Sequence, residues 1–113
     1  MKKIDYLSTL FVGIDIGSRT NVISAIDFNQ EFFIRMKPVS NSQPGAEELE
    51  SLIIKVLEQN HQFKMVIIGL ESTGFYGVHI ANYLSASDKL APFSVNVYCL
   101  TMYIPTFLRT SSR

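Results

Sequence analysis

Residues 10–16 read Leu-Phe-Val-Gly-Ile-Asp-Ile, a nearly unbroken apolar run that carries one carboxylate, Asp15, close to its end. Such a run is typical of a central β-strand that is covered on both faces. An unpaired carboxylate in that position is costly unless it is neutralised, paired or bound to a metal. The alternative is that the strand ends at Gly13 and that Asp15 accepts hydrogen bonds from the turn amides of Gly17 and Ser18.

The residues after this strand predict two consecutive hairpins. A tight turn at 17–19 leads to β-forming residues at 22–27, and a second turn near Asn29 leads to a further strand at 31–36. Three antiparallel strands therefore begin the fold.

Two helices and two more strands are predicted beyond the hairpins. Capping residues at 41–44 precede an amphipathic helix that ends near Asn60, and its apolar residues recur at helical spacing: Leu49, Leu52, Ile53, Val56 and Leu57. The patterns then predict a strand at 65–70, a helix at 75–84 and a last strand at 94–100, in which Cys99 is expected to face the core.

The resulting order, β-β-β-α-β-α-β, predicts an α/β fold with a mixed five-stranded sheet. Parallel strands need a crossover connection, and that crossover is right-handed. The ribonuclease-H-like fold matches this order best. Fold alone does not give function, which depends on the residues of a site.

Composition limits the classes of protein to be considered. A chain of 113 residues supports one domain, and 47% apolar with 18% charged residues excludes a disordered tail. Ten basic and ten acidic residues cancel, which argues against strong non-specific binding to nucleic acid. A single cysteine excludes an internal disulfide, and no stretch predicts a signal peptide or a membrane span, so a cytoplasmic setting is expected.

Glu71 is the second candidate acid. It follows the predicted strand at 65–70, and ligands of open α/β sheets bind at the carboxyl ends of strands. The alternative is a first-turn acid stabilised by the dipole of the next helix. In the predicted order Asp15 and Glu71 lie on neighbouring strands, and two close carboxylates repel unless a divalent cation lies between them. Oxygen ligands suit Mg²⁺ or Mn²⁺, and two such ions can clamp the reacting oxygens of a phosphodiester.

Four polar residues flank the two acids: Ser18, Arg19, Ser72 and Thr73. They are candidates for binding the phosphates of a nucleic acid, helped by amides at the start of the second helix. The alternative for Ser72 and Thr73 is that they cap that helix.

Three motifs taken together resemble a known family. They are Phe-Val-Gly-Ile-Asp-Ile-Gly-Ser at 11–18, Ile-Gly-Leu-Glu-Ser-Thr-Gly-Phe-Tyr at 68–76 and Val-Asn-Val-Tyr-Cys-Leu at 95–100. The combination is similar to the amino-terminal domain of the insertion-sequence 110 family of transposases, also called DEDD transposases. The resemblance implies a partial RuvC-like nuclease domain at 1–100, followed by an unmatched tail at 101–113.

The family resemblance also carries expectations about activity. It implies enzymes that excise and insert mobile elements, with four acids and Mg²⁺ acting on DNA. Members work as oligomers with a second domain that carries a nucleophilic serine, and some are guided by an RNA. By this resemblance Asp15 matches the first acid and Glu71 the second, so both are expected to be catalytic and to bind the metal.

The other two acids of the family have no counterpart. No acid follows Asp88, and residues 100–103 read Leu-Thr-Met-Tyr where the family has Asn-Pro and then an Asp-x-x-Asp pair. We therefore expect a truncated copy, a frameshift product or a cut piece of a longer chain, inactive by itself.

Two other functions compete with this interpretation. Gly-Ile-Asp-Ile-Gly-Ser at 13–18 also resembles the first phosphate loop of actin-like ATPases and sugar kinases, whose acid holds Mg²⁺ beside a nucleotide. The second is a non-catalytic remnant that only pairs with complete transposase subunits, which the missing acids and the zero net charge favour.

Overall fold

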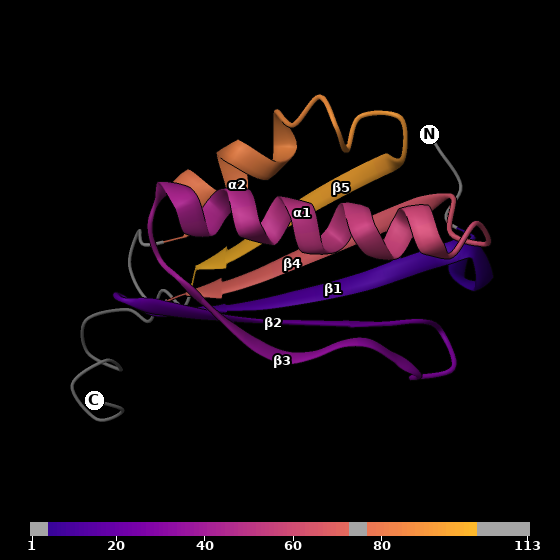
Figure 1. Ribbon diagram of the computed structural model, residues 1–113, viewed down its shortest axis with the longest axis horizontal. Helices are drawn as coiled ribbons and strands as arrows, with labels where there is room; N and C mark the ends of the chain where they lie inside the picture. The colour runs from indigo at the N-terminus through magenta and orange to yellow at the C-terminus, as the bar shows by residue number, and fades with distance from the viewer. Residues whose placement is uncertain (1–4, 73–76, 102–113) are drawn as a thin grey trace.

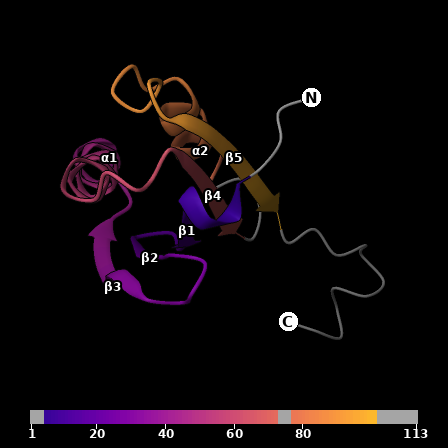
Figure 2. The same ribbon diagram turned by 90° about the vertical axis from the view of Figure 1, so that its right-hand side faces the viewer.

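A computed structural model describes residues 5–72 and 77–101 of the chain. The strands form one five-stranded sheet, and Figures 1 and 2 show both helices packed on the same face of it. The strand order across the sheet is β3-β2-β1-β4-β5. In chain order the elements are η1 (Tyr6–Ser8), β1 (Thr9–Ile16), β2 (Thr20–Ile26), β3 (Phe32–Ser40), α1 (Gln43–Gln59), β4 (Met65–Ser72), α2 (Val78–Ser85) and β5 (Ser94–Thr101).

The predicted order of strands and helices is confirmed. β1, β2 and β3 pair antiparallel as two hairpins, whereas β4 pairs parallel with both β1 and β5. The helix α1 carries the chain from the edge strand β3 to β4, and α2 connects β4 with β5. This mixed sheet is the ribonuclease-H-like arrangement that the sequence predicts.

The core lies between the sheet and the two helices. Alternate residues of the strands point toward the helices and are buried there, as the period of two in a strand requires. The helix α1 begins at the predicted place, because the Ser42 side chain accepts a hydrogen bond from the Gly45 amide and caps the first turn. The buried apolar residues of β1, β4 and the helices include Leu10, Val12, Ile14, Val66, Ile68, Leu70, Leu49, Ile53, Ile80 and Leu84.

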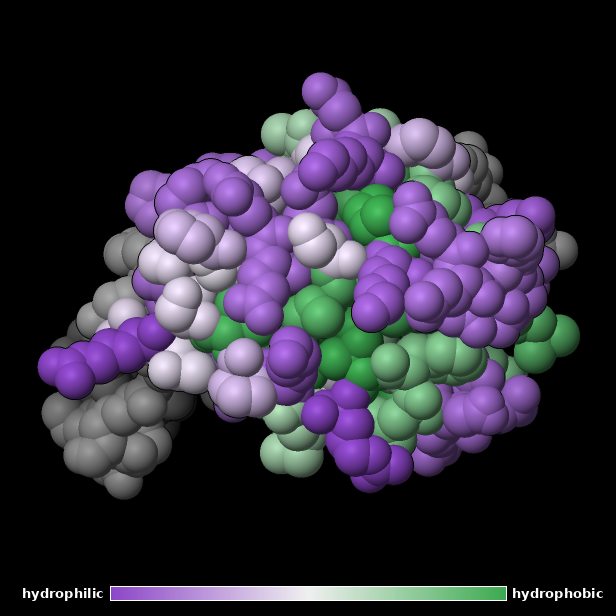
Figure 3. Space-filling model, viewed as in Figure 1, coloured by the Kyte–Doolittle hydropathy of each residue, from purple (hydrophilic) through white to green (hydrophobic). Residues whose placement is uncertain are grey.

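The second face of the sheet differs from the prediction. β1 was expected to be covered on both faces, but both helices pack on one side, and no other described element covers the opposite side. Gly13 and Asp15 are consequently exposed. Figure 3 views the helix-bearing side, where hydrophilic side chains cover much of the surface. We call the opposite side the open face.

Several element boundaries also differ from the prediction. β3 continues to Ser40, because its pairing with β2 shifts register around Met36, which has a positive φ of 42°, and then resumes. β4 runs on through Glu71 and Ser72. The helix α2 begins at Val78, and the two residues predicted to start it, 75 and 76, lie outside the described part of the chain.

The prediction that Cys99 belongs to the core is wrong, although the residue lies on the helix-bearing side of the sheet as register partner of the buried Leu70. The cysteine is exposed because β5 is an edge strand and is less well covered than β1 or β4. Neither helix of the described residues is long and apolar enough to cross a lipid bilayer.

A buried carboxylate connects the two helices. Glu50 of α1 is 7% exposed and accepts hydrogen bonds from the Tyr83 hydroxyl (3.2 Å) and from the Ser87 hydroxyl. The Ser87 oxygen in turn accepts from the Leu90 amide, so the loop after α2 is held in the same network. Partial burial and the carboxylates of Glu50 and Glu47 raise the pKa of Tyr83 above its usual value near 10.

Candidate functional site

Asp15 and Glu71 lie side by side at the carboxyl ends of two adjacent parallel strands. They are register partners in the β1–β4 pairing, and both side chains are exposed. Because directly opposed residues of paired strands point to the same side of a sheet, both carboxylates lie on the open face. The predicted juxtaposition of the two acids is therefore confirmed.

A cavity of about 480 Å³ adjoins the two acids on the open face. Gly13 and Gly69, which are also register partners, form its floor. A Cβ atom placed on either glycine would meet nothing within 4 Å. The glycines therefore leave open space beside the carboxylates, into which a larger side chain would project.

The remaining walls of this cavity are mainly apolar. Val22, Ser24 and Met36 contribute from β2 and β3, and no basic side chain lines it among the described residues. The two acids thus lie side by side, and the described residues place no cationic side chain in the wall of the adjoining cavity. Two carboxylates supply only part of the oxygen shell of Mg²⁺, and the described residues contain no group of three or more metal-ligating side chains.

The structural alternatives for the two acids do not fit the geometry. Asp15 lies inside β1, which continues to Ile16 rather than ending at Gly13. The Gly17 amide donates instead to the Thr20 carbonyl oxygen (3.1 Å) and to Asn21 Oδ1 (3.2 Å). Glu71 belongs to β4 and does not lie in the first turn of α2.

Two asparagines that the sequence analysis did not single out hold the turn after Asp15. Asn21 is fully buried and accepts from the Gly17 amide, and Asn41 Nδ2 donates to the Gly17 carbonyl oxygen at 2.6 Å. The Asn41 amide also donates to the Arg19 carbonyl oxygen at 2.8 Å. The sequence placed Asn41 only among the capping residues at 41–44, because its partner Gly17 lies far away in the sequence, in the turn between β1 and β2.

A glycine is required at position 17. A Cβ atom there would lie 2.5 Å from the Thr20 carbonyl oxygen, and no side chain can be accommodated at that distance. The end of the strand that carries Asp15 is therefore fixed by contacts that depend on the exact sequence of this turn.

The other predicted site residues are only partly brought together. Ser18 and Arg19 are exposed in the turn that follows β1. Ser72 is 3% exposed on the helix-covered side of β4, so it does not share the open face with Glu71. It does not cap α2 either, because Gly77 is the N-cap residue of that helix and makes no side-chain cap bond. Thr73 lies outside the described residues.

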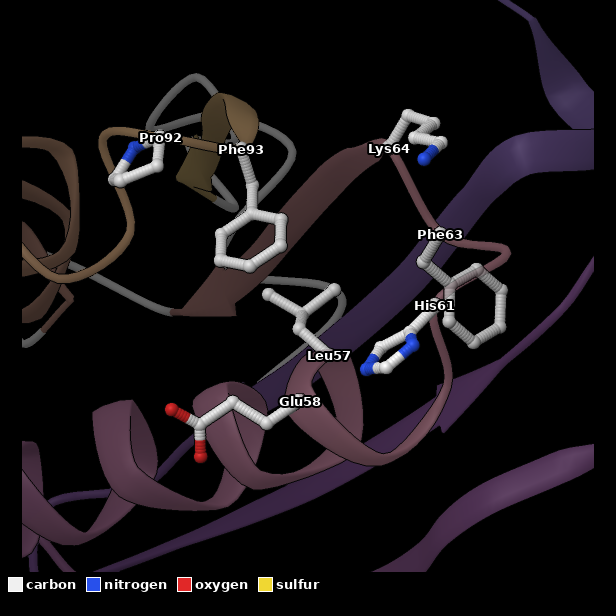
Figure 4. A pocket seen from close by; sticks show the side chains of 7 residues that line it. All are labelled: Leu57, Glu58, His61, Phe63, Lys64, Pro92 and Phe93. Carbon is white, nitrogen blue, oxygen red and sulfur yellow. The ribbon is translucent and has the colours of Figure 1, made fainter.

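A second cavity, of about 540 Å³, lies at the other end of β4 (Figure 4). It adjoins Lys64, just before the first residue of β4, whereas Glu71 lies near the last. This cavity is therefore separate from the acid pair. Its lining residues are Leu57, Glu58, His61, Phe63, Lys64, Pro92 and Phe93.

Comparison with protein families gives one match. A family model of DEDD transposases of the insertion-sequence 110 type, described as Transposase, matches residues 12–103. The match contains both Asp15 and Glu71 and most of the described sheet. Comparison with curated proteins gives no match.

Comparison with solved structures gives distant similarities, among them Pelota and a Ppx/GppA phosphatase. Pelota from Archaeoglobus fulgidus is 16% identical, with a TM-score of 0.48 over 92% of this chain and 31% of that one. The type II variant of the Ppx/GppA phosphatase from Aquifex aeolicus is 9% identical, with a TM-score of 0.42 over 83% of this chain and 36% of the other. The chain thus spans about a third of the length of these proteins.

Proposed function

The chain belongs to the insertion-sequence 110 family of DEDD transposases, and from this membership we propose that it is an amino-terminal part of an enzyme that cuts and joins DNA phosphodiesters. The observation that carries the proposal is the register pairing of Asp15 with Glu71 beside a cavity on the open face. We assign residues 1–100 to the nuclease domain and leave 101–113 as a tail of no assigned function.

Asp15 and Glu71 are the residues that would hold a divalent cation. Their donor atoms are all carboxylate oxygens, they are accessible to solvent, and their charges add at one place, which is the chemistry that Mg²⁺ and Mn²⁺ prefer. When bound, such an ion polarises a phosphoryl oxygen and activates a water molecule or hydroxyl group as nucleophile.

The remaining residues of the site position the nucleic acid. The depression above Gly13 and Gly69 lets a sugar-phosphate backbone approach the carboxylates without meeting a side chain at these two positions. Ser18 and Arg19, exposed in the turn after β1, donate hydrogen bonds to phosphate oxygens further along the strand. The sequence predicts the same role for Ser72 and Thr73. The burial of Ser72 argues against it there, whereas Thr73, outside the described residues, stays a candidate beside Ser18 and Arg19.

The partners follow from the family and from the charge balance. DNA is the substrate, and with a net charge of zero the chain binds it weakly unless further subunits or domains contribute cationic surface. A guide RNA and a homo-oligomer belong to the same proposal for the complete protein. By itself the chain serves as a partial domain, because two carboxylates hold a cation loosely and leave the clamp on both reacting oxygens incomplete.

The test is direct binding of Mn²⁺, measured by the loss of the free-ion electron paramagnetic resonance signal during titration. We expect the parent to bind one ion, and Asp15→Asn and Glu71→Gln each to weaken binding at least tenfold. Glu58→Gln is the matched control, because Glu58 is an exposed acid at the second cavity, away from the pair. Equal binding by all four proteins would refute the assignment.

A further inference from the structure

The two edges of the sheet differ in how they are protected. β3 forms one edge and β5 the other, and in the described part of the chain each is hydrogen-bonded to a neighbouring strand on one side only (Figure 1). An edge strand presents unpaired backbone N–H and C=O groups that can pair with another chain.

β3 carries the features that block such pairing. Arg35 and Lys37 place positive charge on the strand, and Pro38 lacks a backbone donor. Met36 has a positive φ of 42°, and the register with β2 shifts in this region, so the strand is irregular. Charge, proline and irregularity are the devices that natural sheets use to prevent edge-to-edge association.

β5 carries none of these features. The strand Ser94–Thr101 reads Ser-Val-Asn-Val-Tyr-Cys-Leu-Thr, without a charged residue or a proline. It pairs with β4 from Ser94 to Thr101 without a register shift, so it is regular along its length. Tyr98 is 51% exposed and Cys99 is exposed as well, which leaves uncharged side chains at the edge.

We propose that β5 pairs antiparallel with β5 of a second copy of this chain, which joins two sheets into one continuous sheet. A two-fold axis perpendicular to the sheet gives this pairing and keeps the helices of both copies on the same side. Residues opposed across such an axis come from the same strand, so any charge on it would face a like charge nearby. The uncharged β5 meets that condition, and β3 does not.

The geometry also favours pairing of β5 with β5 of the second copy over pairing of β5 with β3 of that copy. Pairing of β5 with β3 of another copy is heterologous and would continue into an open-ended fibre. The charges, the proline and the irregularity of β3 prevent it. A β5–β5 pair closes after two copies, and the zero net charge of the chain places no overall repulsion between them. This inference does not depend on the proposed nuclease function.

The test introduces charge on one side of β5. The side chains of Asn96 and Tyr98 both point to the open face. One double variant replaces both residues with Lys and the other replaces both with Glu. Each places like charges on the two strands that meet at the two-fold axis. Molar mass is measured by light scattering after gel filtration. We expect the parent at twice its chain mass of 12.8 kDa and each double variant at the mass of a single chain.

The decisive experiment mixes the two double variants. An equimolar mixture of the Lys and Glu double variants should return to twice the chain mass, which a folding defect cannot produce. Met36→Lys is the matched control, because Met36 is 70% exposed on the other edge strand, and this variant should stay dimeric. As a second measurement, a short bismaleimide should join two parent chains through Cys99, the only cysteine.

Four results would overturn the proposal: a monomeric parent at every concentration, double variants that stay dimeric, a Met36→Lys variant that dissociates as they do, or a mixture that does not reassemble. If the double variants fail to fold, the absence of a Cys99 cross-linked dimer in the parent overturns it. Association into particles of undefined size would also overturn the proposal, because a β5–β5 pair closes after two copies.

Discussion

Asp15 and Glu71 are register partners on adjacent parallel strands, although β2, β3 and α1 lie between them in the sequence. The pairing places two like charges on the open face without a basic residue in the adjoining cavity, among the residues described. The cost of that repulsion, and its relief by a cation, can be measured on the folded chain without any assay of activity.

The first prediction concerns stability without metal. Because each carboxylate repels the other, Asp15→Asn and Glu71→Gln should leave the free energy of unfolding unchanged or raise it by up to about 1 kcal/mol. Asp27→Asn is the control, since Asp27 Oδ1 accepts from the amides of Asn29 and Glu31 at 2.9 Å each. That variant should lose about 0.5 to 1.5 kcal/mol. Urea unfolding gives the values, and equal losses at all three acids would contradict the repulsion.

The second prediction concerns divalent ions. A ligand that binds only the folded state stabilises it, so millimolar Mn²⁺ or Mg²⁺ should raise the melting temperature of the parent. Asp15→Asn and Glu71→Gln should each reduce that rise, because each removes a ligand. Melting is followed by circular dichroism at fixed ionic strength, which keeps general screening constant. The same rise in all three proteins would exclude the acid pair as the metal site.

The third prediction concerns activity. The purified chain should not nick supercoiled plasmid DNA with Mg²⁺, because two carboxylates do not complete the clamp on the attacking and leaving oxygens. Gel electrophoresis of the plasmid measures the outcome. Nicking that requires Mg²⁺ and is abolished by Asp15→Asn would show that the two acids suffice.

The fourth prediction concerns Tyr83. Partial burial and the carboxylates of Glu50 and Glu47 raise the pKa of Tyr83, so its protonated form stabilises the folded state. That stability is present below about pH 10, the unfolded pKa, and is lost as pH rises through the folded pKa. Glu50→Gln removes a charge and should lower the pKa of Tyr83. Phenolate absorbance during titration reports it, with Tyr83→Phe to assign the signal; an unshifted titration in Glu50→Gln would contradict the assigned cause.

The fifth prediction contrasts two glycines. Gly45→Ala places a methyl group on the Ser40 carbonyl oxygen and should cost about 2 kcal/mol or more, because that oxygen belongs to the backbone. Gly13→Ala meets open space and should raise stability by about 0.5 kcal/mol, since alanine restricts the unfolded chain. Urea unfolding of both variants is the measurement. A loss at Gly13 as large as that at Gly45 would mean that the depression on the open face is already filled.

The sequence was sufficient for the order of elements and for the acid pair. The spacing of Leu49, Ile53 and Val56 placed α1 within a residue or two of its observed ends. The motifs around Asp15 and Glu71 put both acids at the ends of neighbouring strands. Both predictions rest on local sequence patterns. The rules for connections between parallel strands then predict that the two strands are neighbours in the sheet.

Which side of each strand is covered could not be predicted from local patterns. Ser72 follows Glu71 directly, yet a shift of one residue moves a strand side chain to the opposite face. The apolar run around Asp15 fits equally well in a strand covered on one face or on two, and no local pattern shows that the strand of Cys99 lies at an edge. The role of Asn41 at the turn was not predicted for a related reason, because its hydrogen bond to Gly17 joins residues that only the folded sheet brings together.

The crossover through α1 also determines when the two acids meet during folding. The hairpins of β1, β2 and β3 join residues close in sequence and can form on the microsecond scale. The β1–β4 pair must first close the long segment that contains α1, and contacts of such large sequence separation form slowly. We therefore expect repulsion between Asp15 and Glu71 to slow the closure of the parallel pair and to leave the formation of the hairpins unaffected.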